Sequence, residues 1–349
     1  MRRLLVTLLL LPAAPAAAAQ APQPLVDVPP QATSFRDHVG PLTQRGRAVH
    51  DSTPRAYSTA DGQTVSVRFS GSYTPDDAVA QSYVDFLGGL PHGSELSKLK
   101  VYIATPAEVQ DDCGGVEGTL ACYDPTTDTM TVPGEQTADD GSGITTSYVV
   151  AHEYGHHIAS HRTSAPFLAL NWGPKYWASQ ELVCLNTIKG RLAPGDEGEN
   201  YLANPGEAWA DTYAHLSYPK VRWQFTPMLT PTNASKAAAL KDVLTPWAGN
   251  VTRTFSGHFA PGGAKVRAFP VALHLDGSLR IALHGPAAAN FDISVSSLGA
   301  DRGHTHGPHA NDVYVTRYAC REVQSENVLV KVVRRTGAGA FTVTVNYAG

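Results

Sequence analysis

The hydrophobic pattern of this chain changes its period near residues 246–252, and this change limits the available folds more than any other feature. Before this point, apolar residues recur with the spacing of amphipathic helices between short strand-like runs. After it, short alternating runs are separated by Gly, Pro and Asp, which is typical of an antiparallel sandwich or barrel. We therefore expect an α+β domain over residues 61–247 and an all-β sandwich domain over residues 252–349.

Local patterns predict the elements of each domain. Residues 63–70 alternate, with Val65, Val67 and Phe69 on one face, so we expect a strand there. In the first domain, further strands are expected at 100–104 and 129–132, and helices at 78–90, 145–160, 205–218 and 235–244. In the second domain, strands are expected at 268–275, 278–284, 290–295, 327–333 and 340–346.

The first nineteen residues have the pattern of a secretory signal peptide. Arg2 and Arg3 precede the apolar run 4–11, and an alanine tract ends at Ala19, where cleavage is expected. The apolar run is far shorter than the ~20 residues of a membrane-spanning helix, so we expect a secreted, extracellular protein without membrane contact. Residues 20–60 are rich in Pro, Ala, Gln and Ser and are expected to form an extended leader or propeptide.

Four cysteines in an exported chain predict two disulfides. Cys113 and Cys122 flank a glycine-rich loop, so a local bridge between them is natural, and Cys184 and Cys320 are then left to pair across a longer span. Bridges of these lengths stabilise a fold by about 3–5 kcal/mol each. A cysteine metal site is disfavoured, because the chain lacks the CxxC spacing.

The charge composition disfavours one class of partner. Charged residues make up 17% of the chain and the net charge is −4, so we expect no surface for nucleic acid. The chain contains 14 histidines beside 4 cysteines and 3 methionines. Whether any of these histidines can bind a metal ion or take part in catalysis depends on their spacing.

One pair of histidines has the spacing of a metal site. Within the expected helix 145–160, His152, Glu153 and His156 form the pattern HExxH. Residues four apart lie about 40° apart around a helix, so the two imidazoles project from one face and can share a metal ion. Glu153 stands beside them, where it can reach a water molecule on that metal and act as a general base.

A catalytic zinc needs a third protein ligand and one open position. The extended pattern HExxHxxGxxH requires Gly at position 159 and His at position 162, and the chain has Ala159 and Arg162 there. The third ligand should therefore come from another helix. Glu207 and Asp211, one turn apart on the expected helix 205–218, place two carboxylates on one face.

HExxH followed by a helix with ExxxD resembles the gluzincin zinc metallopeptidases, the thermolysin-like clan. The resemblance covers residues 62–245 and is specific at 152–156 and 204–211. It implies that Glu207 is the third ligand of one catalytic Zn²⁺, in a small zincin-like domain. It also implies that Asp211 accepts a hydrogen bond from a ligand histidine, His152, and so fixes its tautomer.

The same resemblance implies an oxyanion-stabilising Tyr or His outside the two motifs, for which Tyr201, Tyr213 and His215 are the candidates. The spacer of about 50 residues between His156 and Glu207 is longer than in thermolysin, so we expect it to be an insertion that shapes the substrate groove. Separately, residues 252–348 resemble a bacterial pre-peptidase C-terminal β-sandwich domain.

Other histidines are expected to have packing or surface roles. His157 and His161 point about 140° and 180° away from His152 on the same helix, as packing or surface residues do. His304, His306 and His309 lie in a loop punctuated by Gly and Pro, which is expected to be exposed.

Two further groups could bind a metal but have weaker patterns. His92 and Glu95 stand in an expected turn between a helix and a strand, where they are expected to be solvated. The acidic stretch 196–199 could bind calcium, but it lacks the pattern of an EF-hand.

Together these features predict a secreted, monomeric zinc endopeptidase that acts on a protein or peptide substrate. Glu153 would take a proton from water and pass it to the leaving amine. Two alternatives stay open: a secreted binding protein whose metal site is structural or inactive, and a zinc hydrolase that acts on a non-peptide bond. The intact Glu153 argues against an inactive site, because a structural metal needs no general base.

Overall fold

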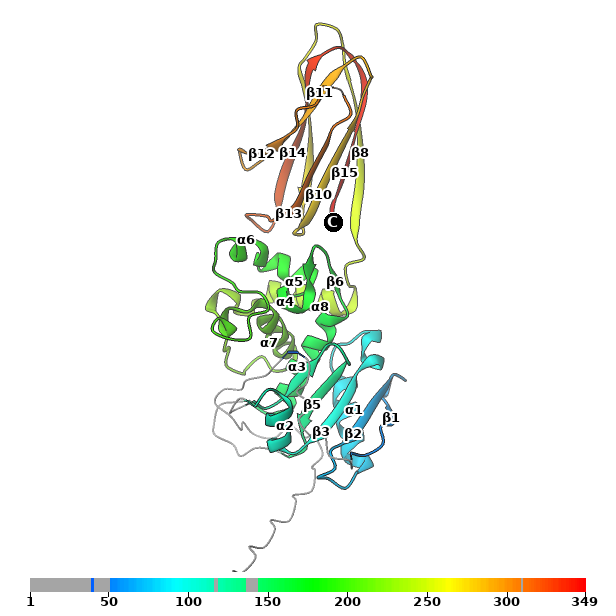
Figure 1. The fold of residues 1–349 in the computed structure, drawn as a ribbon, viewed down its shortest axis with the longest axis vertical. Coiled ribbons are helices and arrows are strands. Elements are labelled where there is room, and N and C mark those ends of the chain that lie inside the picture. Colours follow the sequence, from blue (N-terminus) through cyan, green and yellow to red (C-terminus); the bar gives the residue numbers. More distant parts are fainter. Residues whose placement is uncertain (1–38, 41–50, 116–118, 136–143, 309) are drawn as a thin grey trace, which may run out of the picture.

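The computed structural model describes residues 39–40, 51–115, 119–135, 144–308 and 310–349. The predicted signal peptide and most of the predicted leader lie outside these residues. In Figure 1 the chain forms two parts along its long axis, a mixed part of helices and sheet and a part made of antiparallel strands. They meet between α8 (Asn233–Leu244) and β8 (Asn250–Phe259), where the hydrophobic pattern changes.

A five-stranded sheet forms the base of the first part, in the order β1-β2-β3-β5-β4. Its central strands β2, β3 and β5 are parallel, whereas β1 and β4 run antiparallel at the two edges. The strands are β1 (Arg55–Ser58), β2 (Thr64–Phe69), β3 (Lys100–Ala104), β4 (Cys122–Asp124) and β5 (Thr129–Pro133). The alternation predicted for β2 is confirmed, since Val65, Val67 and Phe69 are all buried.

The sheet begins earlier than residue 61, the predicted start of the domain. β1 pairs antiparallel with β2, and Ser52 N donates a hydrogen bond to Phe69 O at 3.0 Å. Residues 51–60, which we expected to belong to the leader, therefore form an edge of this sheet. The sequence does not reveal β1 because three of its four residues are exposed and only Tyr57 packs against the core.

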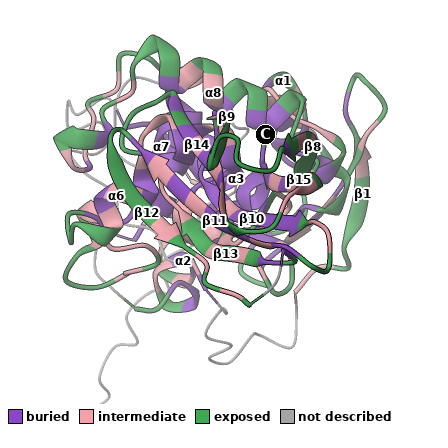
Figure 2. Ribbon diagram, turned by 90° about the horizontal axis from the view of Figure 1, so that it is seen from above, coloured by how far each residue is buried: buried purple, intermediate pink, exposed green. Residues whose placement is uncertain are grey.

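The first helices flank the sheet, and the later ones build a layer between it and the sandwich (Figure 1). They are α1 (Asp77–Gly89), α2 (Pro106–Asp112), α3 (Thr146–Ser160), α4 (Ala169–Trp172), α5 (Lys175–Gln180), α6 (Val183–Ile188), α7 (Pro205–Ser217) and α8, with 3-10 turns at Ser94–Lys98, Tyr201–Ala203 and Pro227–Leu229. The four predicted helices are confirmed to within two residues at each end. α3 is the central one, since every residue from Thr146 to Ala159 is buried (Figure 2).

The second part is a sandwich of two four-stranded antiparallel sheets, ordered β13-β10-β15-β8 and β12-β11-β14-β9. Its strands are β8, β9 (Val266–Leu273), β10 (Gly277–His284), β11 (Asn290–Ser297), β12 (Ala300–His304), β13 (Val313–Ala319), β14 (Glu326–Thr336) and β15 (Gly339–Ala348). The two remaining strands, β6 (Thr163–Ser164) and β7 (Phe167–Leu168), form a small hairpin in the first part. Alternate side chains such as Ile281, Val295, Val330 and Val343 fill the space between the sheets. The predicted order of an α+β part followed by an all-β part is confirmed.

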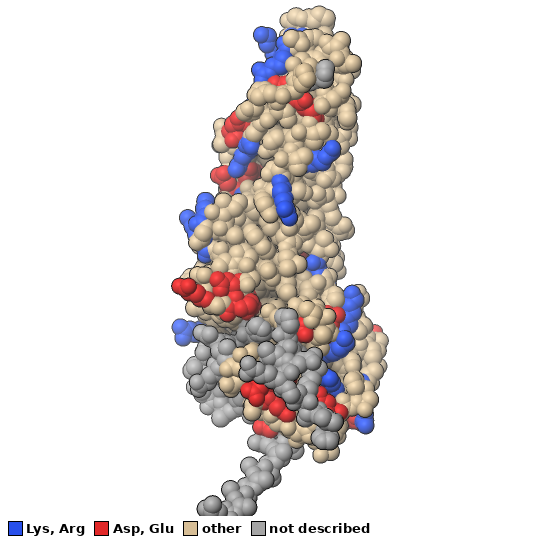
Figure 3. Space-filling model, in the orientation of Figure 1, with Lys and Arg blue, Asp and Glu red and all other residues tan. Residues whose placement is uncertain are grey.

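Both expected disulfides are present, Cys113–Cys122 and Cys184–Cys320. The second joins α6 to the segment after β13, so it ties the two parts covalently. Disulfides of this kind are typical of proteins outside the reducing cytosol. Each helix of the described residues is too short or too polar to cross a lipid bilayer. On the described part of the face in Figure 3, Lys and Arg are scattered among Asp and Glu.

Lys175, at the start of α5, lies buried at the junction of the two parts. Its Nζ donates hydrogen bonds to Ala165 O at 2.7 Å and, across the junction, to Asp276 O at 2.9 Å. It also lies 4.4 Å from the centre of the Trp247 ring. Burial penalises its ammonium form and lowers the pKa of Lys175 to about 8.

This lowered pKa makes the stability of the junction depend on pH in a defined direction. The unfolded chain holds the Lys175 proton up to about pH 10.5, whereas the folded chain releases it near pH 8, so the free energy of unfolding rises with pH between these values. We expect the free energy of unfolding, measured with urea, to increase between pH 7.5 and pH 9.5. This increase should be about 2 kcal/mol larger in the wild type than in Lys175→Met. Equal gains in the two proteins would contradict this prediction.

Candidate metal centre

The HExxH pattern lies on α3, whose start is fixed by Thr145. The Thr145 side chain accepts a hydrogen bond from Tyr148 N at 3.1 Å, which caps the helix. His152 and His156 then lie one turn apart on one face, and both are fully buried. Glu153, beside them, is fully buried as well.

The ExxxD pattern lies on α7, which begins with Pro205. The Asn204 side chain caps this helix by accepting a hydrogen bond from Gly206 N at 2.9 Å. Glu207 falls in the first turn and Asp211 one turn later, and both side chains are buried. The two carboxylates that sequence places on one face therefore lie inside the protein.

Gly155 allows α3 and α7 to cross at close range. A Cβ atom at this position would lie 2.8 Å from Ala210 Cα and 3.2 Å from Ala210 Cβ, closer than side chains pack. The Trp209 indole Nε1 donates a hydrogen bond to Gly155 O at 3.0 Å, which holds the crossing from the α7 side. The glycine within HExxH is thus the point at which the two motif helices touch.

The crossing brings three ligand atoms together. His152 Nε2 and His156 Nε2 are 3.1 Å apart, and Glu207 Oε2 lies 3.4 Å from each of them. A tetrahedral ion at about 2.0–2.1 Å from its ligands needs ligand atoms about 3.3 Å apart. Glu207 Oε2 is buried and accepts no hydrogen bond from the described residues. The donor set and its spacing therefore fit a zinc ion.

Asp211 lies behind this group of ligands. Its Oδ1 is 3.5 Å from His152 Nδ1, the ring nitrogen that faces away from Glu207, and it accepts a hydrogen bond from the Tyr148 hydroxyl. Burial, and next the charge of Asp211, raises the pKa of Tyr148 well above its usual range, so the phenol keeps its proton. Asp211 therefore faces the His152 ring from the side opposite the three ligand atoms, where it could orient the imidazole.

The three oxyanion candidates have different surroundings. The Tyr213 hydroxyl donates to Pro91 O at 2.7 Å inside the core. His215 is also buried, and its two ring nitrogens lie 2.8 Å from Asp211 O and 2.9 Å from Val221 O. Tyr201 is half-buried, and its ring packs on Phe225 (5.6 Å), which in turn stacks on His152 (6.3 Å). Of the three, Tyr201 alone combines partial exposure with a position on the His152 side.

The expected solvated turn at His92 and Glu95 is not correct for Glu95. This carboxylate is buried and pairs with Arg162 at 2.9 Å. It also accepts hydrogen bonds from the Tyr154 hydroxyl at 3.0 Å and from Gly93 N at 2.8 Å. Its partners lie up to 67 residues away along the chain, so local sequence could not reveal this role.

The other expected binding groups take ordinary places. In the acidic stretch 196–199, Asp196 accepts hydrogen bonds from Gly198 N and Asn200 Nδ2, both at 2.8 Å, within its own loop. His304 and His306 are exposed, as expected, and His309 lies outside the described residues. His157 is buried, and burial lowers its pKa to about 4.

Comparisons with known proteins add little to this geometry. No protein family and none of the curated proteins searched matches the chain. Among solved structures, the pre-peptidase C-terminal domain of a collagenase from Bacillus anthracis matches with a TM-score of 0.22 and 10% identity. The match covers 27% of this chain and 89% of that domain. The description of the second part as a sandwich is therefore based on its strand pairing.

The close crossing at Gly155 predicts the effect of a single methyl group. Gly155→Ala should separate α3 from α7, lower zinc affinity at least tenfold and destabilise the fold by about 1–3 kcal/mol through overpacking. Zinc competition with a chromophoric chelator and urea unfolding measure both effects. Gly89→Ala is the control, because a Cβ at Gly89 meets nothing within 4 Å. Wild-type zinc affinity in Gly155→Ala would contradict this account of the crossing.

The position of Asp211 behind His152 gives a second prediction. Asp211→Asn keeps the size of the side chain but removes its charge, and we expect zinc affinity to fall about 10–100-fold. Asp77→Asn is a matched control, since Asp77 also accepts a hydrogen bond from a tyrosine hydroxyl but stands exposed on α1. In the same competition assay, Asp77→Asn should bind zinc with the wild-type affinity. Equal zinc affinities of the two variants would contradict the predicted role of Asp211.

Proposed function

We propose that the protein is a secreted zinc endopeptidase of gluzincin type, with a zincin-like first domain. The observation that carries this proposal is the triangle of His152 Nε2, His156 Nε2 and Glu207 Oε2, with edges of 3.1–3.4 Å, beside the buried Glu153. The expected signal peptide and the two disulfides support export.

The number of protein ligands favours catalysis over a structural metal. Structural zinc sites are closed by four protein ligands, whereas catalytic sites use three and leave one position for water or substrate. Within the described chain, the group formed by His152, His156 and Glu207 offers three ligands. This count supports an enzyme over the alternative of a binding protein with a structural site.

A bound zinc ion would polarise the substrate carbonyl and lower the pKa of water to about 7. His152, His156 and Glu207 would hold the ion, and Asp211 would keep the His152 ring oriented. Glu153 would accept the proton of the attacking water and deliver it to the leaving amine nitrogen as the peptide C–N bond breaks. Positioned proton transfer of this kind contributes about 10²–10⁴-fold to the rate.

The edge strand β4 supports a peptide as the substrate. An extended peptide binds most simply by adding a strand to the edge of a sheet. β4 forms one edge of the sheet and contacts α3 through the Tyr123 and His157 rings, 5.4 Å apart. A segment of the chain itself pairs with this edge, since Gly40 N donates to Tyr123 O at 3.2 Å and Val39 bridges Tyr123. This bridge shows that the backbone at the β4 edge can pair with a second segment.

Glu153→Gln tests the proposal most simply. We expect the variant to retain zinc, because Glu153 is not a ligand, and to lose casein cleavage by at least 10²-fold. Wild-type cleavage should stop with a chelator and return with added zinc. Glu199→Gln, at an exposed acidic position, is the matched control and should cleave normally.

The alternatives give different results in the same experiment. Zinc-loaded Glu153→Gln that cleaves casein at the wild-type rate would exclude Glu153 as the base. Wild-type protein that binds zinc, unfolds when it is removed and cleaves no casein would favour a structural site. Chelator-sensitive hydrolysis of ester or amide model compounds without casein cleavage would favour a hydrolase of non-peptide bonds.

A further inference from the structure

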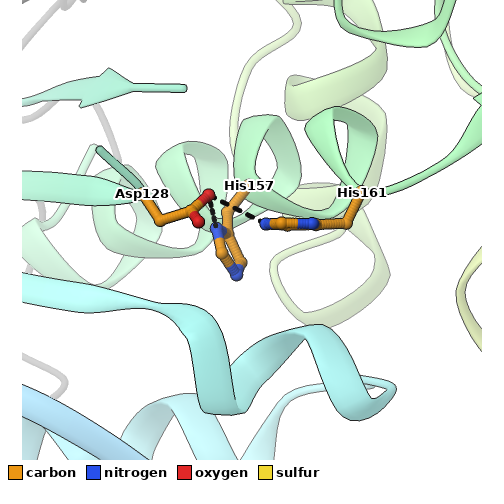
Figure 4. Close-up of side chains that lie close together, drawn as sticks. All are labelled: Asp128, His157 and His161. Carbon is orange, nitrogen blue, oxygen red and sulfur yellow. Dashed lines mark hydrogen bonds and ion pairs between the residues drawn. The ribbon is translucent and has the colours of Figure 1, made fainter. Parts of the chain in front are cut away.

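A second group of metal-binding side chains lies at the other end of α3, outside the proposed catalytic centre. His157 is buried on the last turns of the helix, and His161 follows one turn later, at its C-terminal cap. Asp128 reaches them from the turn between β4 and β5, where its backbone is left-handed with φ of 55°. Figure 4 shows one oxygen of the Asp128 carboxylate linked by dashed lines to a ring nitrogen of each imidazole.

The three side chains offer one ligand atom each to a common point. Asp128 Oδ1 lies 2.8 Å from His161 Nε2 and 3.7 Å from His157 Nδ1. All three atoms lie within 4.8 Å of one another. Ligand atoms around a tetrahedral zinc lie about 3.3 Å apart, so small side-chain movements would adapt the group to an ion.

The hydrogen bonds of His157 leave a ring nitrogen without its own proton. His157 Nε2 lies 2.8 Å from Glu95 O, and a backbone carbonyl can only accept, so Nε2 carries the hydrogen of the neutral ring. His157 Nδ1 is then an acceptor, and it faces the Tyr123 hydroxyl at 3.0 Å and Asp128 Oδ1. Both of these neighbours belong to the same small cluster.

The Tyr123 hydroxyl links the members of the cluster. The Tyr123 oxygen lies 3.0 Å from His157 Nδ1, 2.9 Å from Asp128 Oδ1 and 2.9 Å from Ser160 Oγ. Ser160 donates its own proton to His157 O at 2.8 Å. The phenolic proton can reach His157 Nδ1 or Asp128 Oδ1, and His161 Nε2 also lies 2.8 Å from Asp128 Oδ1. A cation in the cluster would replace these hydrogen bonds by direct contacts to the same three atoms.

We propose that His157 Nδ1, His161 Nε2 and Asp128 Oδ1 bind a second divalent metal ion. Two imidazoles and one carboxylate suit a borderline transition ion such as Zn²⁺ better than Ca²⁺ or Mg²⁺, which prefer oxygen ligands. The side chains of His161 and Asp128 are 18% and 27% exposed, so solvent can reach the ion and supply a further ligand. The ion would tie the β4–β5 turn to the end of the helix that carries HExxH.

Lys98 sets the affinity of this second centre. Its Nζ lies 3.4 Å from His161 Nδ1 and can donate to it, which places the proton of a neutral His161 ring on Nε2. Binding of the ion moves this proton to Nδ1, so the exposed Lys98 side chain must turn away. Lys98 therefore opposes the metal, and its removal should strengthen binding.

Zinc stoichiometry and affinity, measured by calorimetric titration and by metal analysis after dialysis against buffered Zn²⁺, test the proposal. We expect two equivalents in the wild type and one in Asp128→Asn, His161→Ala and Glu207→Gln. Asn suits the left-handed turn at position 128, so Asp128→Asn should stay folded, which circular dichroism verifies. Lys98→Ala should bind the second equivalent more tightly, and His304→Ala, at an exposed histidine elsewhere, should still bind two.

Tyr123→Phe separates a metal centre from a purely hydrogen-bonded cluster. It removes the hydroxyl but none of the three ligands, so it should retain two equivalents. A wild type that binds one equivalent, with Asp128→Asn and His161→Ala titrating identically, would overturn the proposal. A different result would contradict the proposed catalytic centre without affecting the second site: Glu207→Gln that binds as much zinc as the wild type.

Discussion

The close approach of α3 to α7 at Gly155 and Ala210 is the contact on which the metal centre depends. The two histidines on one helix and the glutamate on the other form a metal site only at this distance. Trp209 fixes the same crossing, because its indole donates to Gly155 O at 3.0 Å. The small size of Gly155 thus allows the ligand atoms of the two helices to come together.

Burial gives this arrangement its chemical character. Three carboxyl groups and two imidazoles lie together in the interior, each at most 1% exposed: Glu153, Glu207, Asp211, His152 and His156. Buried charges are costly unless they are paired or coordinate a metal. A divalent ion is a compensation that suits this donor set, so the centre should be both tight and important for stability. In the second group, the side chains of Asp128 and His161 are 27% and 18% exposed, so the cost of their charges is smaller.

The sequence predicts those parts of the fold that depend on local periodicity and capping. The helix at 145–160 was expected from its pattern and is observed as Thr146–Ser160 with the Thr145 cap, and the alternation of the C-terminal runs predicted two-faced strands. Short elements with little apolar surface, such as β1 and α4 to α6, have no such signal. For the candidate site, HExxH and ExxxD indicated His152, His156 and Glu207 as a set, and the structure brings their ligand atoms together.

Contacts between distant segments are what the sequence could not provide. Glu95 looked like part of a solvated turn, but it pairs with Arg162 in the interior. His157 and His161 were assigned to packing or surface roles from their angles on the helix, because nothing local indicates that the turn at Asp128 meets them. The role of Gly155 is similar, since its closest neighbour, Ala210, comes from another helix.

The central claim is that the crossing of α3 and α7 holds a metal ion with an open position. Anomalous scattering at the zinc edge, from crystals of the zinc-loaded wild type, tests it directly. The account predicts a peak bounded by His152 Nε2, His156 Nε2 and Glu207, with a fourth ligand that does not come from the protein. Zinc found only at exposed histidines, or a fourth ligand from a protein side chain at this centre, would contradict it.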